Sequence, residues 1–179
     1  MAQIDGLVFA GYRSCDAGAD DPFRIKWNAV RPSFELPAGA EVPALTVAAI
    51  GAFNAEINQR IIYTPEPDSG DAWQTPAQTL TILHGDCEDY AILKYATLLQ
   101  AGLSAASLRI VIGEIISIAG NKPHAWCAAY LDSVWHALDN KFDRIIGVAD
   151  YVNWLPLAAM HDANVVRFGR EFTINDRIR

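Results

Sequence analysis

The stretch GDCEDYAILKYATLLQAG, residues 85–102, has the pattern of a helix buried in a protein core. Asp86 has the chemistry of an N-cap, Asp89 lies three residues further on, and Gly102 suits the position after the last turn. Apolar side chains form a broad surface between these ends, at Ala91, Ile92, Tyr95, Leu98 and Leu99. Cys87 therefore falls in the first turn of a helix that we expect to be deeply packed.

Two further helices are predicted ahead of this stretch. PALTVAAIGAFNAEINQRII, residues 43–62, spaces its apolar side chains at helical intervals. A short helix follows, with Thr75 as its N-cap, Pro76 at its first position and Gln78 completing a capping-box pattern. The prolines, glycine and acids of TPEPDSGDAW, residues 64–73, predict a loop between the two helices.

Beyond residue 107 the pattern changes to alternating or continuous apolar runs, which are typical of strands. The runs occupy residues 108–118, 124–131, 134–140, 144–148 and 170–174. Asp132 and Ser133 separate the second run from the third, as a tight hairpin requires. We therefore predict one α+β domain over residues 1–179, with helices first and an antiparallel sheet second.

The predicted hairpin brings two polar residues together. A two-residue turn at Asp132 and Ser133 places Asp139 opposite Trp126, and His124 two residues further along the same face. Such a pair suits the orienting hydrogen bond that supports the base of a thiol nucleophile. A three-residue turn would move Asp139 to the other face, and a polar contact within an ordinary sheet is the alternative reading of the pair.

Cys87 is the candidate nucleophile. Unpaired backbone donors and the positive end of the helix dipole favour a thiolate at this position. The neighbouring carboxylates of Asp86, Glu88 and Asp89 act in the opposite direction and disfavour it. We therefore expect a cation or a histidine close to Cys87.

The remaining cysteines, Cys15 and Cys127, are expected to be small buried hydrophobes. Three cysteines without metal-ligand spacing indicate neither a disulfide framework nor a zinc site. A zinc site made from Cys87, His84 and His124 is an alternative, although its spacing has no recognised form.

The composition limits the partners of the chain. A formal charge of -7 and a pI near 4.9 oppose binding to a phosphate backbone, so no nucleic-acid partner is expected. No apolar run approaches the roughly twenty residues of a membrane span. Residues 1–18 lack the cationic segment of a signal peptide, so we expect a cytoplasmic protein, or a periplasmic one if the chain is a processed form. The sequence does not set an oligomeric state.

The central part of the chain resembles a known family. GDCEDYAILKY, preceded by DAWQTP and followed by HAWCAAYLDSVWHALDN, is similar to the bacterial transglutaminase-like cysteine proteinases, the group that includes LapG-type proteases. The resemblance covers roughly residues 61–140. It implies a papain-like transglutaminase core, in which a helix that carries the nucleophile at its start packs on an antiparallel sheet.

The resemblance also implies a role for each candidate residue. Cys87 would be the nucleophile, His124 the general base and acid, and Asp139 the residue that orients the imidazole. Trp73 would add an indole N–H to the backbone amide of Cys87 in the oxyanion hole.

LapG-type proteases are calcium-dependent, and the resemblance places the ion on Asp86 and Glu88. Carboxylate oxygens suit calcium, but two acids are too few, so backbone carbonyls or the loop 68–71 would have to contribute. No organic cofactor is expected.

The predicted function is hydrolysis of a peptide bond in a protein or peptide substrate, through an acyl-thioenzyme and a Cys-His-Asp triad. The substrate would be a surface adhesin if the protein is LapG-like. If an amine took the place of water, the protein would be an acyltransferase or transglutaminase, and an amidase could use the same triad. A non-catalytic scaffold that binds a peptide or calcium is a further alternative.

Overall fold

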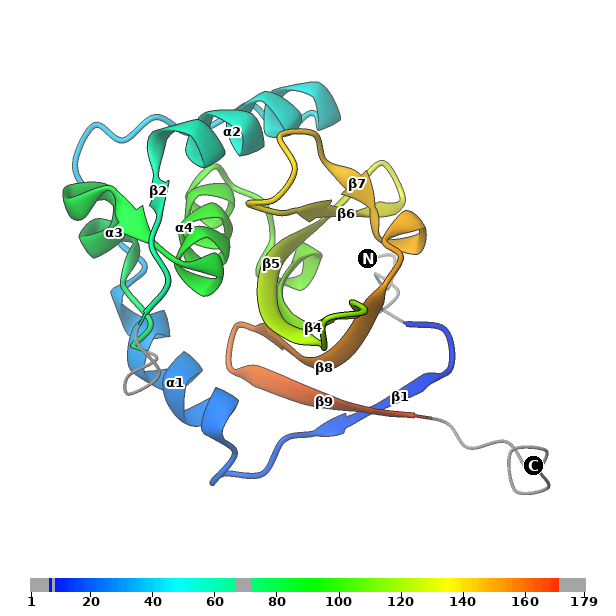
Figure 1. Ribbon diagram of the computed structural model, residues 1–179. Coiled ribbons are helices and arrows are strands. Elements are labelled where there is room, and N and C mark those ends of the chain that lie inside the picture. The colour runs from blue at the N-terminus through cyan, green and yellow to red at the C-terminus, as the bar shows by residue number, and fades with distance from the viewer. Residues whose placement is uncertain (1–6, 8, 67–71, 171–179) are drawn as a thin grey trace, which may run out of the picture.

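The computed structural model describes residues 7, 9–66 and 72–170, in which helices gather beside a curved sheet (Figure 1). The helices are α1 (Pro22–Val30), α2 (Val47–Arg60), α3 (Pro76–Ile82) and α4 (Cys87–Gln100), with short 3-10 turns η1 (Arg31–Ser33), η2 (Ala105–Ser107) and η3 (Val148–Asp150). Among them α4 lies nearest to the sheet. None of the helices in these ranges has the length and apolar character that a membrane crossing needs.

The larger sheet has seven strands in the order β1-β9-β8-β4-β5-β6-β7, and all neighbouring strands are antiparallel. These strands are β1 (Tyr12–Asp16), β4 (Leu108–Ile115), β5 (Lys122–Leu131), β6 (Val134–Leu138), β7 (Ile146–Gly147), β8 (Trp154–His161) and β9 (Asn164–Arg170). A separate parallel pair joins β2 (Ile62–Tyr63) to β3 (His84–Gly85). The predicted α+β class, with a Cys87-bearing helix packed on an antiparallel sheet, is confirmed.

Both ends of α4 are capped as the sequence predicts. The backbone N–H of Asp86 donates to Oδ2 of Asp89 at 3.2 Å. After the last turn Gly102 adopts a φ of 99°, and the amides of Gly102 and Leu103 donate to carbonyls of that turn. This is the arrangement that a glycine after a helix makes possible.

The apolar surface of α4 packs on the face of the sheet that carries Cys127. Ile92, Leu93 and Leu98 have no exposed surface, and burial of each such side chain stabilises the fold by about 1.5–3 kcal/mol. The opposite face carries Trp126 and a second apolar cluster. The position of the start of α4 relative to β5 is therefore set by a large part of the core.

The hairpin between β5 and β6 has the predicted two-residue turn. Asp132 and Ser133 have φ values of 49° and 66°, as a type I′ turn requires. Leu131 therefore pairs with Val134, which is the predicted register. Asp139 follows directly after β6.

The N-terminal part of the chain differs from the prediction. A strand precedes the helices, because β1 pairs with β9 along its whole length. Its sequence, YRSCD, is mostly exposed and lacks a hydrophobic pattern that sequence reasoning could use. Cys15 lies in this strand and is exposed, so its predicted burial is wrong, whereas the predicted burial of Cys127 is confirmed.

Some elements are shorter than the apolar runs that predicted them. The helix predicted from residue 43 begins at Val47, because the hydroxyl of Thr46 accepts the amide of Ala49 as an N-cap. The run 108–118 is a strand only as far as Ile115. Most of the predicted strand at residues 170–174 lies outside the described residues.

Candidate active site

Cys87 is the first residue of α4, and its side chain is partly buried. The thiol donates to Oε2 of Glu88 at 3.3 Å, and the backbone amide of Ala125 on β5 hydrogen-bonds the sulfur. Ala125 is the residue after His124. The strand that carries the candidate base therefore meets the start of α4 at the candidate nucleophile.

His124 and Asp139 form a buried pair. Nε2 of His124 lies 2.8 Å from Oδ1 and 3.0 Å from Oδ2 of Asp139. The side chains are only 3% and 1% exposed. Since Nε2 is directed at the carboxylate, Nδ1 is the ring nitrogen that remains for a proton exchange.

The carboxylate of Asp139 is held from several sides. The amide of Lys141 donates to Oδ1 at 2.9 Å, and the hydroxyl of Tyr151 donates to Oδ2. Burial acts to raise the pKa of Asp139, but His124, Tyr151 and the Lys141 amide together hold it below the usual value. Asp139 is therefore an ionised acceptor over a wide pH range.

Three aromatic residues, Trp126, Tyr151 and Trp154, form a wall beside this pair. Tyr151 stacks on Trp126 at 5.4 Å between ring centroids, and the rings of Trp154 and His124 meet edge to face, with centroids 6.1 Å apart. Gly113 makes room for the wall, because a Cβ at this position would lie 2.5 Å from Cζ2 of Trp154. The imidazole is thus confined by packing as well as by its hydrogen bond.

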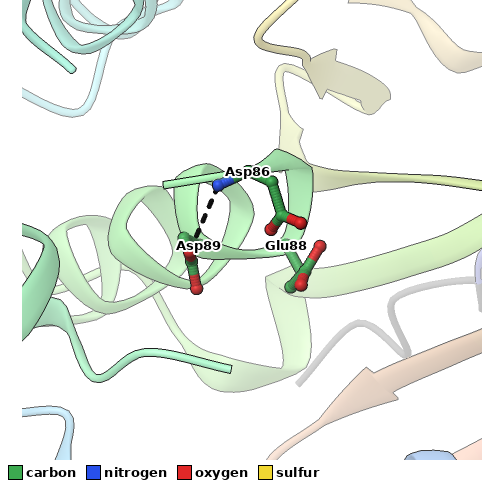
Figure 2. Close-up of side chains that lie close together, drawn as sticks. All are labelled: Asp86, Glu88 and Asp89. Atoms are coloured by element: carbon green, nitrogen blue, oxygen red, sulfur yellow. Dashed lines mark hydrogen bonds between the residues drawn. The ribbon is translucent and has the colours of Figure 1, made fainter. Parts of the chain in front are cut away.

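Asp86, Glu88 and Asp89 form an acidic cluster at the start of α4 (Figure 2). An oxygen of each carboxylate lies within 4.8 Å of the other two. Burial, with the hydrogen bond and charge of Asp86, raises the pKa of Glu88 to about 9. Burial also raises the pKa of Asp89 to about 7, although the amide of Gln74 acts to lower it. Close carboxylates of this kind are costly to ionise without a cation.

The three acids have different surroundings. Oδ1 of Asp89 accepts the amide of Gln74 at 2.8 Å, and its Oδ2 accepts the amide of Asp86. A Cβ at Gly85 would lie 2.8 Å from both Cβ and Oδ2 of Asp89, so this glycine leaves room for the carboxylate. In Figure 2 the carboxylates of Asp86 and Glu88 point to one side of the helix and that of Asp89 to another. Asp89 therefore caps the helix, while the carboxylates of Asp86 and Glu88 lie together on the other side.

The acidic cluster fits a hard divalent cation. All three side chains offer carboxylate oxygens, which are the ligands that calcium prefers. The loop 68–71, considered above as a source of further ligands, lies outside the described residues. Within the described ranges no second group of three acids, cysteines or histidines is close enough to share an ion, so Cys87, His84 and His124 do not form the alternative zinc site.

The acids also control the thiol. Burial raises the pKa of Cys87 far above its usual value, and the charges of Glu88 and Asp86 raise it further. The amide of Ala125 acts to lower it. Without a compensating positive charge, Cys87 is therefore a protonated thiol at neutral pH.

Trp73 lies in the segment that leads into α3. Its side chain is partly buried against the main core, and Nζ of Lys26 lies 5.7 Å from the centroid of the Trp73 ring. The backbone N–H of the next residue, Gln74, donates to the carboxylate of Asp89. This bond ties the Trp73 segment to the helix that carries Cys87.

Sequence reasoning missed Tyr151 and Trp154. Tyr151 is 12 residues from Asp139 in the chain and belongs to no motif. Trp154 reaches His124 because β8 lies beside β4 and β4 lies beside β5. Only the strand order could have revealed the contact of Trp154, and Tyr151 lies outside the strands.

Comparison with known structures agrees with this fold. The structure of Legionella pneumophila LapG matches with a TM-score of 0.57 and 22% sequence identity, over 75% of this chain and 71% of that chain. The calcium-bound LapG of the same organism matches with a TM-score of 0.60 and 22% identity, over 83% of this chain and 80% of that chain. At this level of identity the likeness concerns the fold.

Comparison of sequences identifies the family. No curated protein matches the chain. Residues 35–162 match the model of the family described as bacterial transglutaminase-like cysteine proteinase, BTLCP. The matched range covers most of the chain and contains Cys87, His124 and Asp139. The chain therefore belongs to the bacterial transglutaminase-like cysteine proteinase family.

Proposed function

We propose that the protein is a cysteine peptidase that hydrolyses a peptide bond of a protein substrate through an acyl-thioenzyme. The buried pair of His124 and Asp139, on a hairpin whose Ala125 amide reaches the Cys87 thiol, is the observation that carries the proposal. A thiol, an imidazole and an orienting carboxylate are the groups that thiol-dependent acyl transfer needs.

The reaction follows from the geometry of the imidazole. His124 takes the thiol proton at Nδ1, because Asp139 occupies Nε2. The Cys87 thiolate attacks the peptide carbonyl, and the imidazolium donates its proton to the leaving amine. Water, deprotonated by the same imidazole, then releases the acid from Sγ and restores the thiol. Asp139 keeps the tautomer and stabilises the imidazolium.

The oxyanion of each tetrahedral intermediate requires two donors. We assign one to the backbone N–H of Cys87, because the first N–H groups of a helix have no partner within the helix. The second is the indole N–H of Trp73, which can only donate. The bond between Gln74 and Asp89 supports this assignment, because it holds the Trp73 segment against the start of α4.

We also propose that Asp86 and Glu88 bind calcium. The calcium-bound structure of Legionella pneumophila LapG and the raised pKa of Glu88 both support a cation at this point. Calcium, when bound, supplies positive charge beside the thiol. With Asp86 and Glu88 neutralised, two of the causes that raise the pKa of Cys87 are removed, and His124 can take its proton.

Alkylation of the three cysteines tests the nucleophile and the ion together. Iodoacetamide is applied between about pH 5 and pH 9, in calcium and in EGTA, and mass spectrometry identifies the modified residue. We expect Cys87 to react below pH 7 in calcium, and to lose this reactivity in EGTA and in His124→Ala. The exposed Cys15 and the buried Cys127 serve as internal references. Reaction of Cys87 only near pH 8.5, indifferent to His124, would reject the catalytic proposal.

Product analysis separates hydrolysis from acyl transfer. A peptide mixture is incubated with the calcium-loaded protein, with and without a primary amine, and the masses of the products are measured by mass spectrometry. Free carboxylates in both reactions support a peptidase. Amide products that depend on the added amine would instead show an acyltransferase.

A further inference from the structure

A buried polar network connects α4 to the loop that carries Asp139. Lys94 on α4 has no exposed surface, and its Nζ donates to Oδ1 of Asn54 at 2.8 Å and to Oδ1 of Asn58 at 2.6 Å. Nζ also lies 5.7 Å from the ring centroid of Tyr90. A buried amine is costly unless its donors are used, so a lysine at this position needs these partners. Lys94, Asn54 and Asn58 are called the Lys94 network below.

Both asparagines continue the network to backbone carbonyls. Nδ2 of Asn58 donates to the carbonyl oxygens of Asp139 at 2.9 Å and Phe142 at 3.0 Å. Nδ2 of Asn54 donates to the carbonyl oxygens of Phe142 at 2.7 Å and Asp143 at 3.1 Å. Because the buried amine takes both amide oxygens, the amide nitrogens must face the loop. The network therefore binds three carbonyls of the loop 139–143.

This loop needs such support. Strand β6 ends at Leu138, so the backbone of Asp139 lies beyond the hydrogen-bond ladder of the sheet. Its carbonyl is bound by Asn58 instead, while its carboxylate faces His124. A shift of the loop would move the carboxylate away from the imidazole.

We infer that Lys94 is a positioning residue which, through Asn54 and Asn58, holds the loop 139–143 so that Asp139 stays in contact with His124. The inference rests on the proposed function of the His124 and Asp139 pair. It gives α4 two roles, because Lys94 lies seven residues after Cys87 and so two helical turns along the same side of the helix. One rigid helix thus sets the nucleophile at its start and the orienting carboxylate through its middle.

Two substitutions interrupt the Lys94 network at different points. Lys94→Met keeps the apolar stem and removes the amine. Asn58→Asp keeps an acceptor for Lys94 and removes the donor to the carbonyls of Asp139 and Phe142; because Asn58 is only partly buried, this variant retains the core. Thr97→Val is the matched control, since it removes a buried hydroxyl from the same helix that donates only to the carbonyl of Leu93.

The first readout is the NMR signal of the ring N–H that His124 shares with Asp139, and its loss in His124→Ala identifies it. The second readout is the rate of Cys87 alkylation by iodoacetamide in calcium at pH 7. In Lys94→Met and Asn58→Asp we expect the signal to disappear and the rate to fall at least about 10-fold, as general base catalysis is lost. Thr97→Val should match the unmodified protein within about twofold.

The NMR signal decides the inference independently of catalysis. If both network variants keep the signal and the alkylation rate, Lys94 only stabilises the fold and the inference is wrong. If Lys94→Met does not fold, Asn58→Asp gives the decision alone. If His124→Ala leaves the alkylation rate of Cys87 unchanged, the proposed function is rejected instead, whatever the network variants show.

Discussion

Nε2 of His124 lies 2.8 Å from Oδ1 of Asp139, and both side chains are almost completely buried. In surroundings of low dielectric this hydrogen bond is stronger than it would be in water. The imidazole is also packed against the ring of Trp154. Its orientation is therefore set before any substrate arrives.

Asp139→Asn should lower the rate of peptide hydrolysis by about 10²- to 10⁴-fold, because an amide can donate to Nε2 and favour the wrong imidazole tautomer. The measurement is the cleavage rate of a peptide substrate in calcium, with circular dichroism to verify the fold. Asp132→Asn is the control, since Asp132 lies in the hairpin turn, where asparagine tolerates a φ of 49°. Equal rates in the two variants would exclude an orienting role for Asp139.

Tyr151→Phe should destabilise the protein by about 2 kcal/mol, because it removes a hydrogen bond to a charged, buried acceptor. It should also move acid unfolding to higher pH. A carboxyl with a lowered folded pKa stabilises the protein above its ordinary value of 3.8, and this stability is lost as the pH falls through the folded pKa. Without the hydroxyl of Tyr151, the pKa of Asp139 rises toward its ordinary value, so the ionised carboxylate contributes less stability and acid unfolding is reached at a higher pH.

The check on this prediction is denaturant unfolding between about pH 2 and pH 7, compared with Tyr130→Phe. Tyr130 packs against the ring of Trp135, outside the aromatic wall beside His124. An unchanged acid limb in Tyr151→Phe would mean that its hydroxyl does not stabilise the Asp139 carboxylate.

Glu88→Gln should make Cys87 less responsive to calcium, and more reactive in EGTA only from about pH 9 upwards, where Glu88 is ionised. The charge of Glu88 is, after burial, the largest cause of the raised pKa of Cys87, so its removal lowers this pKa. The same change removes a proposed ligand of the ion. The rate of Cys87 alkylation against pH, in EGTA and in calcium, measures both effects. Glu56→Gln, on the exposed side of α2, is the control and should behave as the unmodified protein does.

Gly113→Ala should destabilise the protein by roughly 1–3 kcal/mol and weaken the site, because the added methyl group overlaps the ring of Trp154 and the carbonyl of Leu155. Displacement of Trp154 would change its fluorescence and free the imidazole of His124. Gly18→Ala meets no atom within 4 Å and should leave stability within about 0.5 kcal/mol. Retention of full stability in Gly113→Ala would show that β8 can move without cost.

The parts of the site that depend on local pattern were predictable. The caps of α4 depend on a few neighbouring residues, and so does the turn at Asp132 and Ser133. Once this turn is known, the alternation of side chains in a strand places His124 and Asp139 on one face. The family resemblance rests on the same short stretch.

Contacts between distant strands were not predictable from these patterns. The segment that becomes β8 contains Pro156, and a proline argues against a strand inside a sheet. The fold accommodates Pro156 opposite Gly113, where the register of β4 and β8 shifts. The packing of Trp154 on His124 depends on this irregular pairing.

Lys94 was equally hidden. In the sequence it interrupts the apolar surface of a helix, and a lysine in such a position usually reaches solvent. Here the side chain points into the core, because Asn54 and Asn58 of α2 offer it two acceptors. Nothing in the local pattern identifies partners that lie about forty residues earlier in the chain.

The pairing of β1 with β9 has a consequence for synthesis on the ribosome. These strands come from opposite ends of the described chain, so β1 has no partner until nearly all of it has been translated. Pairings of such long sequence separation close slowly, because the intervening chain must first be ordered. The helices and the central strands can assemble earlier. The edge of the sheet formed by β1 and β9 is then completed last. Until that moment the nascent β1 is an unpaired strand that a chaperone could shield.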